Sequence, residues 1–187
     1  MFSYKKDLDY TELYKKLGIN IVNNEPRYNS IESLELFLAK RNNIIDIELG
    51  DKAIHDFIKQ IDFYQKQCFT IGIITMDNIC VIDENIFLIE NADLLPIVDK
   101  YYVSINCIYS KENILLPPEL RENTEIPFKT RVTLCFYSIG KIVQNIIFKK
   151  FNPTEQQQKN ILGNSALFFC LLRATKEKAN HRYLIYI

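Results

Sequence analysis

The hydrophobic pattern of the chain changes its period at Phe69, and this change constrains the fold more than any other feature. Over residues 51–68 apolar side chains recur at helical spacing, as in a long amphipathic helix. From residue 69 to residue 89 the spacing is close to two, and two apolar segments, 79–82 (ICVI) and 86–89 (IFLI), flank the turn residues 83–85. A long helix that leads into a small β-hairpin predicts an α+β domain that is mainly α.

Other segments carry weaker patterns of the same kinds. A short strand is expected at residues 19–22, and residues 90–130, which hold four of the six prolines, are expected to form a surface loop with one short strand near 102–108. The capping residues and apolar spacing predict further helices over residues 7–17, from Asn29 or Ser30 onward, over 134–148, from Asn152 onward and over 165–176. We expect the last of these helices to be buried, because it is apolar on nearly every side.

Length, charge and cysteine content favour one domain in a reducing compartment. The 187 residues contain no linker or repeat, so residues 1–187 are expected to form a single domain. The 23 basic residues balance 23 acidic ones, and no apolar run reaches the length of a membrane helix, so we expect neither nucleic-acid nor membrane binding. Five widely spaced cysteines with apolar neighbours predict buried free thiols in a cytoplasmic protein that is not secreted.

The sequence lacks the local motifs of common cofactor sites. Its five glycines are never closer than 22 residues, which excludes glycine-rich loops that cradle phosphates. The only two histidines, His55 and His181, have no second ligand at metal-site spacing. We therefore expect no cofactor and no metal.

Four short motifs, in order, resemble the large (C-terminal) lobe of eukaryotic-type protein kinases, above all the divergent kinase-like proteins of large DNA viruses. They are similar to the end of the catalytic loop, the Ala-Pro-Glu motif, the start of the central helix and the Asp-Pro-x-x-Arg segment, and they lie at residues 76–83 (MDNICVID), 116–120 (LPPEL), 136–140 (FYSIG) and 179–182 (ANHR). The resemblance implies a kinase-like large lobe over residues 31–187. Residues 1–30 would then be a vestigial hinge or N-terminal segment, too short for the small lobe.

The departures from the family pattern concern its catalytic residues. Ile73 stands at the position of the catalytic aspartate, so no carboxylate there could orient a substrate hydroxyl. Glu90 and Asn91 occupy the magnesium-binding Asp-Phe-Gly position and could serve only as weakened ligands. Cys135 replaces a buried aspartate of the central helix that anchors the catalytic loop.

The remaining family positions have both functional and purely structural interpretations. Asn78 could be a surviving magnesium ligand or an ordinary turn residue before a strand, and Glu90 could be a ligand or a solvated surface residue. The resemblance implies that Glu119 and Arg182 form a buried ion pair with an architectural role. The alternative is that they are two unrelated surface charges.

These expectations define a catalytically inactive, truncated kinase-like protein that acts as a protein-binding module or decoy. A protein partner is expected, whereas ATP and magnesium are not. Two alternatives are a weak or atypical kinase or nucleotide-binding protein, and a structural scaffold protein on the same fold.

Overall fold

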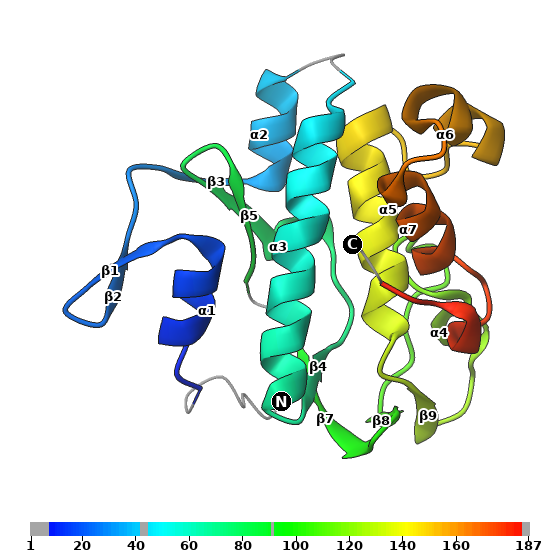
Figure 1. The fold of residues 1–187 in the computed structure, drawn as a ribbon. Coiled ribbons are helices and arrows are strands. Elements are labelled where there is room, and N and C mark those ends of the chain that lie inside the picture. The colour runs from blue at the N-terminus through cyan, green and yellow to red at the C-terminus, as the bar shows by residue number, and fades with distance from the viewer. Residues whose placement is uncertain (1–7, 42–44, 91, 185–187) are drawn as a thin grey trace.

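The computed structural model describes residues 8–41, 45–90 and 92–184 as a mixed α+β fold (Figure 1). Two long helices, α3 (Ile47–Lys66) and α5 (Leu134–Phe148), lie side by side in its centre. The shorter helices are α1 (Thr11–Leu17), α2 (Leu34–Lys40), α4 (Pro118–Glu122), α6 (Glu155–Leu162) and α7 (Ala166–Ala174), with single 3₁₀ turns at η2 (Met76–Asn78) and η3 (Ala179–His181). Among the helices of these residues, none combines the length and apolar character that crossing a membrane requires.

The strands form three small antiparallel sheets around the helices. A two-stranded sheet joins β1 (Asn20–Val22) to β2 (Glu25–Arg27). A three-stranded sheet has the order β3-β5-β6, and a four-stranded sheet has the order β4-β7-β8-β9. Their bounds are β3 (Ile31–Ser33), β5 (Ile79–Ile82), β6 (Ile86–Ile89), β4 (Phe69–Ile71), β7 (Leu94–Asp99), β8 (Tyr102–Ile105) and β9 (Phe128–Arg131). The predicted hairpin is therefore present as β5 and β6, although it carries β3 as a third strand.

Two glycines allow α5 to approach its neighbours closely. A Cβ atom at Gly50 of α3 would overlap with Cγ1 of Ile147, and one at Gly140 of α5 would lie 2.8 Å from Cγ2 of Thr175, just beyond α7. Real side chains do not tolerate such distances, so both contacts depend on the missing Cβ. The main hydrophobic core forms where α3, α5 and α7 meet the hairpin.

Two buried polar side chains of α3 form hydrogen bonds with the backbone of β6, at the edge of this strand that does not face β5. The Asp56 carboxylate accepts a hydrogen bond from the Phe87 N–H (3.1 Å), and Lys52 lies 2.6 Å from the same carboxylate. The Gln60 amide donates to the Phe87 carbonyl (2.9 Å) and accepts from the Ile89 N–H (2.7 Å). These side chains take the place of a neighbouring strand, because buried backbone groups need partners.

Several sequence predictions of secondary structure are wrong. The strand expected near residues 102–108 is present as β8, but the stretch 90–130 also holds β7, α4 and β9, which the sequence interpretation lacks. Strand β7 is hard to recognise from the sequence, because its buried and exposed residues do not alternate regularly and it contains a proline. Helix α2 is capped by Ser33, not by Asn29 or Ser30, since β3 intervenes, and α6 is capped by Thr154, not by Asn152. Helix α7 is buried only along one side, because Ala166, Phe169 (41% exposed) and Arg173 face solvent, whereas the sequence predicts burial on nearly every side.

The prediction of five buried thiols is also wrong in part. Cys80, Cys135 and Cys170 are buried, but Cys68 and Cys107 are exposed. Cys68 lies in the turn after α3 with a φ of 60°, and Cys107 lies in the loop after β8, so their apolar sequence neighbours do not cover them. All five are free thiols.

We expect Cys68 and Cys107 to react with a thiol reagent much faster than the other three cysteines at pH 8. Burial raises the pKa of Cys80 to about 12, of Cys135 to about 12 and of Cys170 to about 11. The reactive thiolate is therefore scarce at these three sites, in addition to being shielded. Titration with a chromogenic disulfide should show two fast thiols in the native state and five in denaturant. Five fast native thiols would contradict the packing of α5 and α7.

Candidate functional site

The ion pair that the sequence predicts between Glu119 and Arg182 is present. Arg182 follows η3, and Glu119 lies in α4, directly after the proline-rich residues 117–118. The guanidinium donates two parallel hydrogen bonds to the carboxylate, Nη1 to Oε1 at 2.6 Å and Nη2 to Oε2 at 2.7 Å. The Arg182 side chain is fully buried, and that of Glu119 is 18% exposed.

Arg182 also binds the backbone around it. Its Nε donates to the Lys176 carbonyl (2.6 Å) and its Nη2 donates to the Glu177 carbonyl. Its guanidinium carbon lies 5.2 Å from the centroid of the Tyr137 ring, which belongs to α5. The Arg182 side chain thus joins α4, α5 and the segment after α7. Its hydrogen bonds hold these elements together, which is a structural role.

Ile73 and Asn78, two of the residues at family motif positions, line a hollow of about 350 Å³. Ile73 is half-buried and packs against a second apolar cluster around Val103 and Leu116. The side-chain amide oxygen Oδ1 of Asn78 accepts hydrogen bonds from the N–H and hydroxyl groups of Thr75, both at 2.9 Å. Asn78 therefore completes the capping box of η2, whose N-cap is Thr75, and this fits its interpretation as a turn residue.

Asp93 lines the same hollow and was missed by the sequence analysis. Its side chain is exposed, and its backbone carbonyl accepts a hydrogen bond from Gly72 N–H at 2.7 Å. The register of β4 with β7 explains this position, because Ile71 pairs with Leu94. The sequence interpretation did not include strand β7. Without the register of this strand against β4, the sequence could not place the Asp93 carboxylate in the same hollow as Asn78.

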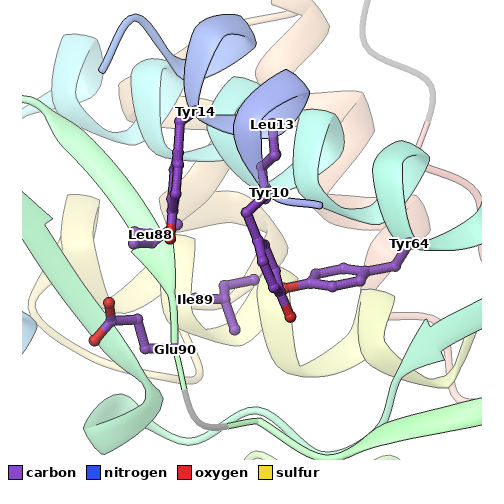
Figure 2. A pocket seen from close by; sticks show the side chains of 7 residues that line it. All are labelled: Tyr10, Leu13, Tyr14, Tyr64, Leu88, Ile89 and Glu90. Atoms are coloured by element: carbon purple, nitrogen blue, oxygen red, sulfur yellow. The ribbon is translucent and has the colours of Figure 1, made fainter. Parts of the chain in front are cut away.

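Glu90 is exposed at the edge of a different hollow, which lies between α1 and β6 and measures about 250 Å³. Figure 2 shows the rings of Tyr10 and Tyr14 projecting from the start of α1 toward the end of β6, with the Glu90 carboxylate at the edge. The remaining described lining residues are Leu13, Tyr64, Leu88 and Ile89. Asn91, the neighbour of Glu90 in the motif, lies outside the described residues.

The electrostatic surroundings of this hollow are negative. Burial raises the pKa of Tyr14, and the nearby Glu90 carboxylate raises it further. The pKa of the Cys80 thiol is raised in the same way, first by burial and then by the Glu90 carboxylate. No basic side chain is among its described lining residues, so a phosphate group would meet repulsion there.

Cys135 stands at the start of α5 and is fully buried. Its sulfur lies 3.9 Å from the hydroxyl oxygen of Thr70 and 3.9 Å from the carbonyl oxygen of Val132. The Thr70 hydroxyl donates to the Val132 carbonyl at 3.0 Å, so β4 and the start of α5 are tied together by a neutral network. A charged carboxylate at this position would need donors that this network does not supply.

The tyrosines of the α1 hollow were not recognised in the sequence as functional residues. Tyr10 and Tyr14 stand four residues apart, which places them on one side of a helix, and this spacing was the available signal. Tyr64 comes from α3, and no local pattern links it to the other two. In the described part of the chain, no three His, Cys, Asp or Glu side chains are grouped so that they could hold a metal ion.

No protein-family model matches this chain, and no curated protein matches it in sequence.

Proposed function

We propose that this protein is a catalytically inactive, kinase-like large lobe that works as a protein-binding module or decoy. The observation that carries the proposal is the bidentate pair of Glu119 and Arg182. The resemblance to kinases implies a pair at these two positions, where it would tie the end of the activation segment to the last helices. The order of the long helix α3, the hairpin β5–β6 and the central helix α5 agrees with the same lobe.

The absence of catalysis is inferred from the residues at the positions that would carry it. Ile73 fills the place of the catalytic aspartate with an apolar side chain that packs against the second cluster. Phosphoryl transfer needs positive groups and a metal to stabilise developing charge. The hollow beside Glu90 offers one carboxylate and three tyrosines instead.

The binding role is supported by apolar side chains exposed around β7 and β8. Val98 is 56% exposed and Ile108 is 59% exposed, and both lie near a groove of about 710 Å³ that Leu94, Pro96 and Ile105 help to line. Contiguous apolar surface of this kind marks contact sites for other proteins. A structural scaffold would use such a surface for self-association, which sedimentation of the purified chain measures.

One observation favours the alternative of a weak or atypical kinase or nucleotide-binding protein. Asp93 and Asn78 line one hollow, and a carboxylate with an amide oxygen is the ligand type that magnesium prefers. The side-chain amide oxygen of Asn78 already accepts two hydrogen bonds from Thr75, which weakens this alternative.

We expect ATP with magnesium or manganese to leave the melting temperature unchanged and to transfer no phosphate to the protein or to generic substrates. A true ligand at 100 times its Kd would stabilise the fold by about 2.7 kcal/mol, which corresponds to about 5–10 °C for a domain of this size. Thermal shift and radiolabel transfer measure the two effects. A shift or an activity that disappears in Asp93→Asn but survives in the matched control Asp99→Asn would establish the alternative.

A further inference from the structure

The hollow between α1 and β6 has the build of an aromatic cage. The Tyr10 ring stands 6.1 Å from that of Tyr14 at an angle of 29°, and 6.4 Å from that of Tyr64 at 74°. Tyr10 is thus stacked on Tyr14 and meets Tyr64 edge to face, so the three rings form one continuous aromatic wall of the hollow, to which Leu88 and Ile89 of β6 add apolar surface (Figure 2). This arrangement offers π-electron density and methyl contacts in the same small space.

The negative charge at the hollow favours a cationic ligand. Glu90 is the only charged residue among its described lining residues, and the ring faces of tyrosine also attract positive charge. The raised pKa of Tyr14, caused by burial and then by Glu90, reflects the same negative surroundings. An anionic or neutral polar ligand would find no donor side chain there apart from the tyrosine hydroxyls.

The size of the hollow limits the ligand to a head group or a side chain. About 250 Å³ is below the range of about 300–1,000 Å³ that encloses drug-sized ligands. A second hollow of about 560 Å³ adjoins it and shares Tyr10 and Tyr14. Its only charged described lining residue is Asp9, so the remainder of a ligand could extend there without meeting a positive charge.

We propose that this cage binds a methylated ammonium group. Its methyl groups would pack against the rings and against Leu88 and Ile89, and its charge would be balanced by Glu90. A quaternary ammonium has no N–H donors that must find acceptors, and its charge is spread over its methyl groups, so it is cheaper to desolvate than a primary ammonium. The group could belong to a small molecule or to a methylated lysine of another protein. This inference goes beyond the proposed function and does not depend on it.

NMR titration of the isotope-labelled protein with choline, and with its neutral isostere 3,3-dimethylbutan-1-ol, tests the cage. We expect choline to shift the resonances of Tyr10, Tyr14 and Glu90, with an affinity at least about tenfold above that of the alcohol, which equals about 1.4 kcal/mol. Glu90→Gln should weaken choline binding about tenfold, and Tyr14→Leu should weaken it to a similar degree. The matched controls are Glu84→Gln, at the opposite end of the hairpin, and Tyr101→Leu, at an exposed tyrosine.

Two peptides, one with trimethyl-lysine and one with unmodified lysine, distinguish the sources of the ligand. Tighter binding of the methylated peptide than of choline would assign the cage to a protein partner, whereas tighter binding of choline would assign it to a small molecule. Equal affinity for choline and the alcohol would overturn the proposal, as would the absence of any shift at these residues. Unchanged choline affinity in Glu90→Gln, a variant at an exposed site that is expected to fold, would also overturn it.

Discussion

Arg182→Ala is expected to lower the free energy of unfolding by about 3–5 kcal/mol. The substitution removes the guanidinium that bonds both oxygens of the half-buried Glu119 carboxylate, and it also removes the donor to the carbonyls of Lys176 and Glu177. Uncompensated groups of this kind cost much more than the loss of a surface contact. Total domain stability is about 5–15 kcal/mol, so urea denaturation followed by circular dichroism should resolve the change easily.

Glu119→Ala should also cost several kcal/mol, because it leaves the guanidinium charge buried without its counterion. The double variant should cost clearly less than the sum of the two single variants, since they share one interaction. The exposed pair of Arg27 and Glu25, 3.3 Å apart, is the matched control, and Arg27→Ala should cost no more than about 1 kcal/mol. If Arg182→Ala also falls below about 1 kcal/mol, the pair does not hold α4 to the C-terminal segment.

The sequence predicts those parts of the fold that depend on residues close together in the chain. The spacing of apolar residues is sufficient for α5, whose bounds agree with the prediction, and for the hairpin of β5 and β6. The pair of Glu119 and Arg182 joins residues 63 positions apart, and it was accessible only through the resemblance to kinases. Strand β7 was missed because its alternation is weak and it contains a proline, although its partner β8 follows after two residues. Strand β9 was missed because its own alternation is weak and α4 separates it in the chain from its partner β8.

The candidate site was less predictable than the fold. The cage combines Tyr10 and Tyr14 from the start of the chain with Tyr64 from α3 and Glu90 after β6, and no motif spans these segments. Glu90 was singled out for its place in a magnesium motif, yet its described neighbours in the hollow are aromatic and apolar. A residue's position in a motif thus drew attention to Glu90, whereas its chemical surroundings depend on contacts made by distant elements.

Gln60→Leu is expected to be the most destabilising substitution on α3 that leaves its side-chain volume nearly unchanged. Gln60 is fully buried, and its amide holds the Phe87 carbonyl and the Ile89 N–H at the free edge of β6. Leucine fills the space but can neither donate nor accept, so both backbone groups lose their partner. Each such orphaned group costs about 1–3 kcal/mol, and the gain from burying a leucine offsets only part of the sum.

Two measurements separate this effect from a general loss of helix stability. Gln156→Leu is the matched control, because Gln156 is exposed on α6 and its side chain bonds the exposed Asn160, so its substitution should stay within about 0.5 kcal/mol of wild type. Native-state amide exchange should accelerate at Ile89 in Gln60→Leu more than at Ile142 of α5, since the Ile89 N–H loses its acceptor directly. Equal acceleration at both amides would show that Gln60 contributes to overall stability without fixing β6. A selective opening of β6 would in turn establish that α3 substitutes for a strand neighbour, and that the hairpin bearing Glu90 keeps its position through side chains of the helix beneath it.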